Sequence, residues 1–161
     1  DKTGKPLSEE TYVDTKAFSE GLAAAQDQYF KYGFINTKGE VVIPFEYSTV
    51  SWFKEGIVAV GMNENGKMRY AYVNKNGERL TDFLYEEAKD FQNGVGRVKL
   101  DGKYGLVDKF GASITCCEYD YISEFKQDGY ALAKKNGHDV LLDKEGVAWV
   151  KVNGVMVKVK F

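Results

Sequence analysis

The residues of this 161-residue sequence that could form a nucleophilic site are two adjacent cysteines, Cys116 and Cys117, and the only histidine, His138. A catalytic thiol needs a neighbouring base, and a third group usually orients that base. No residue near the cysteines in the sequence supplies such activation, and His138 follows the turn residues Asn136-Gly137. We therefore interpret His138 as a turn residue and the cysteines as small, partly buried thiols.

The carboxylates do not form a recognisable acid–base pair or metal site. Glu9-Glu10 and Glu86-Glu87 are adjacent pairs. Neighbours on a strand point to opposite faces, so a solvated strand edge explains these pairs better than a glycosidase site. The recurring Asx-x-x-Gly segments lack the dense oxygen ligands that calcium requires, and zinc needs more Cys and His than the chain contains. We predict a non-catalytic protein without metal or cofactor.

Aromatic residues are the remaining candidates, because they form 14% of the chain. Six tyrosines recur at two positions of a repeating pattern, and packing between repeat units produces such recurrence. A ladder of exposed aromatics for sugars or a peptide is the alternative. An exposed aromatic without a packing role can anchor a partner. The binding candidates are the aromatics outside the pattern: Tyr29, Trp52, Tyr121 and Tyr130. The recurring tyrosines, which we assign to the core, are Tyr32, Tyr70, Tyr104, Tyr47, Tyr85 and Tyr119.

The elements that must position these residues come from an internal repeat. The segment at 32–39 returns at 70–77 and 104–111, with a worn copy at 140–146 and a fragment at 1–4. A constant period near 35 residues is typical of repeat architectures. The closing glycines step by 35, 38, 34 and 35 residues, and they are Gly4, Gly39, Gly77, Gly111 and Gly146.

Each repeat of about 35 residues has the pattern of short antiparallel strands, and no segment has the pattern of a helix. Asn-Gly and Asp-Gly turns between apolar runs predict hairpins. The Asx-x-x-Gly segments have the chemistry of type I turns. Gly33, Ala71 and Gly105 share one position, so we expect no room for a bulky side chain on that side. A third strand follows, most clearly at 40–44.

We expect one all-β repeat domain built from tandem antiparallel hairpins of about 35 residues. At the C-terminus, Val152 opposite Val155 would start an apolar face, as a terminal cap requires. We favour an open, capped array, because a closed ring has no end to cap; the alternative is a small β-propeller whose last blade residues 1–17 complete. The expected segments are a partial repeat at 1–17, repeats at 18–52, 53–90, 91–124 and 125–146, and a capping hairpin at 147–161.

The charge pattern excludes two classes of partner. The net charge is −2, and the 22 basic and 24 acidic residues are well mixed. The sequence therefore has no basic patch for nucleic acid and no basic helix for a membrane surface. No apolar run approaches the roughly 20 residues that a membrane helix needs. The chain starts within a repeat and without Met, so we expect a piece of a longer protein.

The motifs Phe-x-x-Gly-Leu-Ala, Tyr-Gly-Phe-Ile-Asn-x-x-Gly, Val-Ile-Pro and Tyr-x-x-Val resemble the bacterial WG (KWG) repeat. The unit at 18–52 matches nearly throughout and the unit at 91–122 matches well. The second unit has Ala71 in place of the signature glycine, and the fourth has Asp139-Val140 in place of the aromatic-Gly pair. The resemblance implies a bacterial protein, cytoplasmic or of the cell envelope, and it carries over no catalytic residue.

Repeat arrays present extended surfaces. The sequence therefore predicts a scaffold module that binds a protein or peptide. The alternative is a carbohydrate- or cell-wall-binding module that stacks exposed aromatics on sugars. A hydrolase built on a small propeller is a third, less favoured class.

Overall fold

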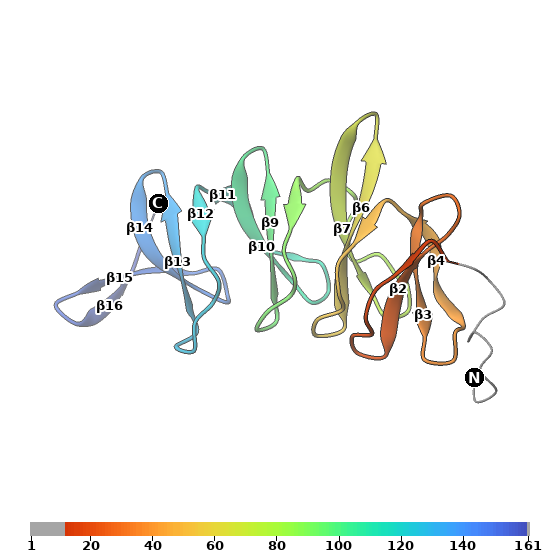
Figure 1. Cartoon of the computed structure of the whole chain (residues 1–161). Helices are drawn as coiled ribbons and strands as arrows, with labels where there is room; N and C mark the ends of the chain where they lie inside the picture. Colours follow the sequence, from red (N-terminus) through yellow and green to blue (C-terminus); the bar gives the residue numbers. More distant parts are fainter. Residues whose placement is uncertain (1–11, 161) are drawn as a thin grey trace. The chain divides into compact units, whose positions relative to one another are not determined.

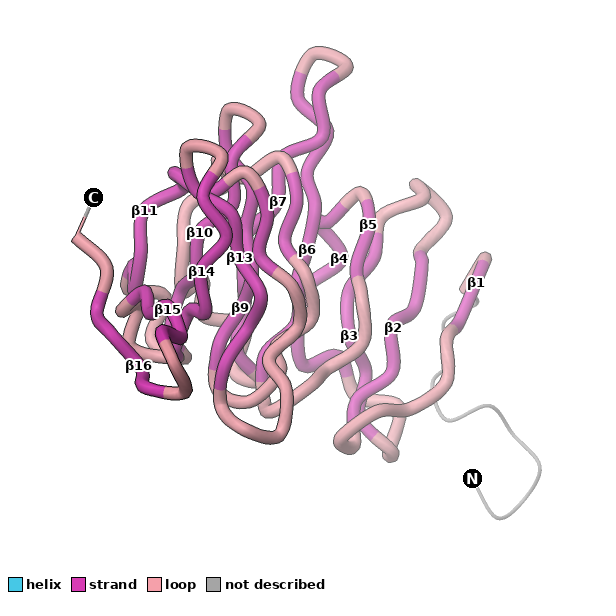
Figure 2. The backbone as a smooth tube through the Cα atoms, turned by 90° about the vertical axis from the view of Figure 1, so that its left-hand side faces the viewer, coloured by secondary structure: helices cyan, strands magenta, loops and turns pink. Residues whose placement is uncertain are grey.

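The structure, a computed structural model, describes residues 12–160. In this range the chain forms strands and loops but no helix, and the strands make four antiparallel sheets (Figures 1 and 2). None of the four sheets in the described range closes on itself. The chain divides into two compact units, one ending at Leu84 and one starting at Tyr85, and each unit contains two sheets.

Each of the four sheets starts with one short strand, which is followed by a hairpin of two longer strands. The first and third sheets then add one more strand, and the fourth adds two. The first sheet contains β1 (Asp14–Thr15), β2 (Leu22–Gln26), β3 (Tyr32–Asn36) and β4 (Val41–Tyr47), and the second β5 (Thr49–Val50), β6 (Ile57–Glu64) and β7 (Lys67–Asn74). The third sheet contains β8 (Glu87–Ala88), β9 (Val95–Leu100), β10 (Lys103–Asp108) and β11 (Ser113–Tyr119). The fourth contains β12 (Tyr121–Ile122), β13 (Tyr130–Lys135), β14 (His138–Asp143), β15 (Ala148–Val152) and β16 (Val155–Lys158).

The short strand that starts a sheet comes from the end of the preceding repeat. Thr49 lies opposite Gly61, and Tyr121 lies opposite Lys134. In the first sheet β1 takes this place. The propeller alternative required residues 1–17 to complete the last sheet, but their described part pairs with β2. The all-β class and the tandem antiparallel repeats are confirmed, and among residues 12–160 no strand pairing closes a ring. Glu9, Glu10 and the fragment at 1–4 lie outside the described residues.

The turns have the predicted chemistry. Asn136 and Gly137, between β13 and β14, have φ values of 50° and 80°, as a type I′ turn requires. In the Asx-x-x-Gly segment after β3, the Asn36 side-chain oxygen accepts hydrogen bonds from the backbone N–H of Lys38 and Glu40, both at 2.9 Å. The equivalent Asn74, Asp108 and Asp143 accept the same two bonds.

The larger buried cluster of each unit lies between its two sheets. Phe34 of the first sheet packs edge-to-face on Phe53, with ring centroids 4.8 Å apart, among the side chains of β6 and β7. Leu106 of the third sheet packs against the fourth. The predicted core position is confirmed for Tyr47 and Tyr119, which are each 2% exposed. The other recurring tyrosines are only half-buried: Tyr32, Tyr70, Tyr85 and Tyr104.

The signature glycine allows the third strand to cross the second. Phe34 pairs with Ile43 and Tyr32 with Tyr47, so β4 bulges over the intervening Gly33. In the second repeat, Ala71 stands at this position and only an isolated Val73–Arg79 bridge follows β7.

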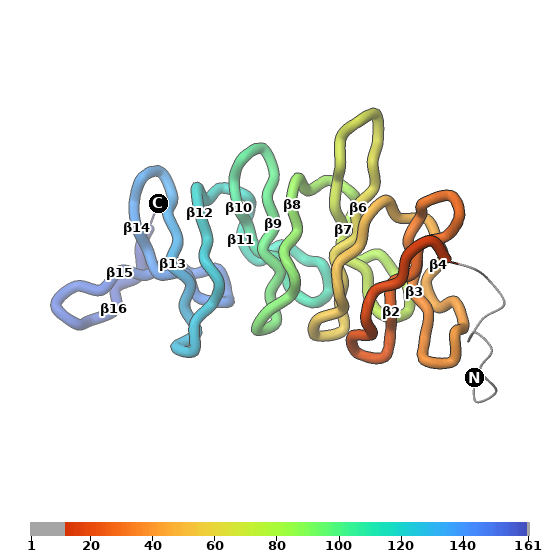
Figure 3. Tube along the Cα trace, viewed as in Figure 1, coloured from red at the N-terminus to blue at the C-terminus, as the bar shows by residue number. Residues whose placement is uncertain are grey.

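In the fourth repeat Val140 stands at the glycine position. Here β15 pairs with β14 only at Leu141 and Leu142. It then turns away to pair with β16, as the trace shows (Figure 3). The side chain at this one position therefore correlates with the path of the chain that follows it.

Candidate interaction surface

The four predicted binding aromatics are divided between the two units. Tyr29 lies in the turn between β2 and β3 and is 72% exposed, and Trp52 lies between β5 and β6 and is 44% exposed. Tyr121, on β12, is 53% exposed, and Tyr130 is half-buried at the start of β13. We therefore describe them as two pairs rather than as one site.

In the first unit Lys16 contacts two aromatic rings, those of Trp52 and Tyr32. The Lys16 ammonium lies 5.1 Å from the Trp52 ring centroid and 5.5 Å from that of Tyr32. The Tyr32 hydroxyl donates to Asp14 Oδ2 at 3.1 Å, and burial, followed by this bond, raises the pKa of Tyr32. A cation over an exposed ring contributes about 0.5–1 kcal/mol. Lys16 thus occupies one face of each ring, which makes Trp52 a poorer platform for a sugar.

In the second unit the fourth sheet has one buried and one exposed face. Ala131 and Ala133 of β13 are buried in the core, so Tyr130, Leu132 and Lys134 point to the opposite face. Among the side chains that the cross-strand register adds to this face are Tyr121 and Asp139 beside Lys134, Leu141 beside Leu132, and Trp149 beside Leu141. We name these seven residues the outer face.

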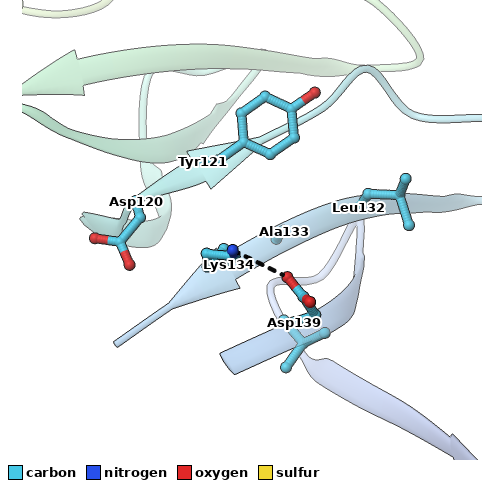
Figure 4. Close-up of a pocket in the computed structure, with 7 residues that line it drawn as sticks. Asp120, Tyr121, Leu132, Ala133, Lys134 and Asp139 are labelled. Atoms are coloured by element: carbon cyan, nitrogen blue, oxygen red, sulfur yellow. Dashed lines mark ion pairs between the residues drawn. The ribbon is translucent and has the colours of Figure 1, made fainter. Parts of the chain in front are cut away.

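A hollow of about 640 Å³ opens at the Tyr121 end of the outer face. Figure 4 shows Tyr121 and Leu132 projecting from neighbouring strands, with Lys134 and Asp139 joined by an ion pair. Lys134 Nζ lies 3.7 Å from Asp139 Oδ1, and both side chains are exposed. Such surface pairs contribute about 0–1 kcal/mol, so a partner can replace one charge at little cost.

Hydrogen bonds fix the polar margin of this region. Asp120 accepts from the Lys103 ammonium and from the Gly137 backbone N–H, and these bonds hold the pKa of its carboxyl below the ordinary value. Trp149 Nε1 donates to Asp143 Oδ2 at 2.9 Å. The indole is therefore held in place at the opposite end of the outer face from Tyr121.

The first and third sheets bury the face that the fourth sheet exposes. Phe34 and Leu106, which precede Leu141 at the same repeat position, are 1% and 0% exposed, whereas Leu141 is half-buried. Leu132 is 48% exposed, and Ala24 at its position in the first repeat is 3% exposed. In residues 12–160 no further sheet follows to cover these side chains.

Of the four predicted binding aromatics, Tyr121 and Tyr130 lie on the outer face, and the sequence prediction did not include Leu132, Lys134 and Asp139. Leu132 carries the clearest signal. The equivalent residues are Ala24, Ala59 and Arg97, so a large aliphatic side chain stands here only in the last described sheet. A position-by-position comparison of the four copies would have identified it.

The cysteines show no sign of activation. Cys116 is exposed and Cys117 is half-buried on β11. Burial, followed by the effect of Cys116, raises the pKa of the Cys117 thiol, which disfavours the nucleophilic thiolate. Glu86 and Glu87 accept from different groups, the Gly102 N–H at 2.8 Å and the Tyr104 hydroxyl at 3.3 Å.

Two further observations cover only the described part of the chain. No three His, Cys, Asp or Glu side chains of residues 12–160 gather as a metal site requires. No helix in that range is long and apolar enough to span a membrane.

The repeated strand plan and the exposed last face define a tandem β-repeat protein. The chain belongs to the family of WG-containing repeats, whose sequence model matches residues 32–67, 70–104 and 104–137. No curated protein matches the chain. It is similar to a solved structure described as "Crystal structure of the computationally designed Ika4 protein", at 17% identity and a TM-score of 0.44, over 87% of this chain and 98% of that chain.

Proposed function

We propose that this chain is a non-catalytic scaffold module, of bacterial origin, that binds a protein partner through the outer face of its fourth sheet. The observation that supports this proposal is the 48% exposure of Leu132 and the partial exposure of Leu141, at positions that the first sheet buries. Burying an exposed Leu stabilises an interface by about 1.5–3 kcal/mol.

The composition of the outer face favours a protein over a sugar. Leu132 and Leu141 lie between Tyr121 and Trp149, and the Lys134–Asp139 pair lies at the margin. An apolar centre with aromatic anchors and a polar rim is the anatomy of a protein interface.

The test is capture of a partner from a bacterial lysate, followed by a binding measurement with the purified partner. The Leu132→Asp variant should lose binding, because it places a charge in the apolar centre. Phe110→Asp is the matched control, because Phe110 is 73% exposed in the turn after β10. If both variants bind as the parent chain does, the outer face is not the binding surface.

A carbohydrate partner is the second candidate, supported by the exposed ring of Tyr121 beside the polar Lys134–Asp139 pair. A Trp52→Phe variant leaves Trp149 as the only tryptophan. Quenching of its fluorescence by an oligosaccharide, absent in Tyr121→Ala, would support this alternative over the protein partner.

A further inference from the structure

The fourth sheet lacks a strand that the first and third sheets contain. Tyr32 of β3 pairs with Tyr47, and Tyr104 of β10 pairs with Tyr119. The equivalent residue of β14 is Asp139. At the edge of β14 that faces away from β13, no strand of residues 12–160 pairs with Asp139. β15 pairs with this edge only at Leu141 and Leu142.

The backbone of Asp139 is directed toward the vacant edge. His138 lies opposite Lys135 beside the two-residue turn, so these two residues exchange backbone hydrogen bonds. In an antiparallel pair the direction of the backbone groups alternates, so the N–H and C=O of Asp139 point away from β13. Backbone groups without a strand partner among residues 12–160 are a template for another strand.

A groove of about 570 Å³ lies beside this edge. It exists because the chain turns away after Trp149 to form the β15–β16 hairpin (Figure 3). Val140, Val150 and Val159 supply its apolar lining. Lys158 at the end of β16 and Lys160 just after it add two cations, and neither forms an ion pair with a described residue.

The strands of the other repeats indicate what fits this place. Both end in Glu-Tyr, at Glu46-Tyr47 in β4 and at Glu118-Tyr119 in β11. The tyrosines are each 2% exposed, and Glu118 pairs with Lys135 Nζ at 2.9 Å. An incoming strand in this register would place its large side chain on the face of Asp139, as Tyr47 and Tyr119 share a face with Tyr32 and Tyr104. The neighbouring carboxylate would point to the Val140 side, where the two lysines line the groove.

We propose that this groove binds an extended peptide segment of a partner protein, with an acidic residue next to a tyrosine or another large apolar residue, as an added strand beside Asp139. The Glu-Tyr segments of β4 and β11 in a second copy of this chain are not available to the groove, because Tyr47 and Tyr119 are buried in their own sheets. The inference rests on the proposed function only for the class of partner, a protein. Asp139 belongs to both surfaces, but strand addition uses its backbone and the two lysines, whereas the outer face uses the side chains of Leu132 and Tyr121. Variants at these residues therefore test the two surfaces separately.

The probe is a labelled ten-residue peptide with the sequence of residues 113–122, carrying Cys116→Ser and Cys117→Ser to prevent oxidation. The control peptide carries Glu118→Lys in addition. Binding to the whole chain is measured by fluorescence anisotropy, and backbone amide exchange is followed by NMR. We expect the probe to bind, to slow exchange of the Asp139 amide, and to bind more tightly than the control.

The protein variants separate the two surfaces. Reversing both lysines, Lys158→Glu with Lys160→Glu, should weaken probe binding about tenfold, because two attractions become repulsions. Both side chains are exposed, so circular dichroism should show an unchanged fold. Leu132→Asp should bind the probe as the parent chain does. If Leu132→Asp abolishes partner binding but no probe binds, the groove inference fails and the proposed function stands.

Three results would overturn the groove inference: no binding of the probe at millimolar concentration, equal binding of the control peptide, or slowed exchange at Met156 and Lys158 of the outer β16 edge without change at Asp139. Slowed exchange at Asp139 that grows with protein concentration in the absence of peptide would also overturn it, since a second copy would then fill the groove.

Discussion

A Cβ atom on Gly33 would lie 2.4 Å from the carbonyl oxygen of Ile43. This distance is shorter than any ordinary contact, and the neighbouring atoms of Pro44 would lie at 2.9 Å. The same conflict recurs in the third repeat, where a Cβ on Gly105 would lie 2.8 Å from the Thr115 carbonyl oxygen. The signature glycine is therefore required by the backbone of the third strand rather than by a ligand.

The first prediction concerns this contact. Gly33→Ala should lower the free energy of unfolding by about 1–3 kcal/mol, because backbone atoms of β4 must move to accept the methyl group. Chemical denaturation measures the change. The matched control is Ala71→Gly, at the equivalent position of β7, where no strand crosses.

Ala71→Gly should cost about 1–2 kcal/mol, from the added backbone freedom of the unfolded chain and the loss of a buried methyl group, with no clash against a crossing strand. If Gly33→Ala is as stable as the parent chain, the crossing strand is not held in place by the glycine.

Much of the fold follows from local signals in the sequence. The Asn136-Gly137 turn and the Asn36 turn are set by residues adjacent in the chain, so pattern reasoning found both. The pairing of Tyr121 with Lys134 was not predictable, because a two-residue strand has no measurable periodicity and its partner is chosen by tertiary packing.

The candidate surface was predictable only in part. The exposure of Tyr121 follows from its departure from the repeat pattern. The exposure of Leu141 does not, because its equivalents Phe34 and Leu106 are among the most buried residues. Burial at this position depends on whether another sheet packs on it, and no local pattern of residues reports that.

The second prediction concerns the Asx turns. Asn36→Ala removes an oxygen that accepts two backbone hydrogen bonds. The free energy of unfolding should fall by about 1–2 kcal/mol, because each net hydrogen bond contributes roughly 0.5–1.5 kcal/mol. Thermal unfolding is the measurement. Thr37→Ala, at the exposed neighbouring residue, should leave stability within about 0.5 kcal/mol, and an equal loss in both variants would contradict the assignment.

The third prediction concerns alkaline pH. Burial, followed by the nearby Glu46 carboxylate, raises the pKa of Tyr47 from 10.0 to about 12. A raised pKa in the folded state means that the neutral phenol stabilises the fold fully below pH 10. This contribution is lost as the pH rises from 10 through 12.

Unfolding free energies measured across that pH range should therefore fall more steeply for the parent chain than for Tyr47→Phe, which has no proton to lose. Tyr29→Phe is the control, because Tyr29 is 72% exposed, and it should follow the parent chain. Parallel pH curves for the parent chain and Tyr47→Phe would show that this hydroxyl does not contribute.

The fourth prediction compares two leucines at the same repeat position. Leu106 is 0% exposed between the third and fourth sheets, whereas Leu141 is half-buried on the outer face. Leu106→Ala should cost about 2–5 kcal/mol, because it leaves a cavity in a packed core. Leu141→Ala should cost about 1 kcal/mol or less in the free chain, since little apolar surface returns to water.

The same pair then tests the outer face in a complex. Once a protein partner covers the outer face, Leu141→Ala should weaken binding of that partner by roughly tenfold, which corresponds to about 1.4 kcal/mol. Isothermal titration with the purified partner measures this change, and denaturant unfolding of the free variants supplies the stability values. A Leu141→Ala variant that loses as much stability as Leu106→Ala would mean that the outer face is already packed in the free chain. A partner that binds this variant with unchanged affinity would place the interface elsewhere.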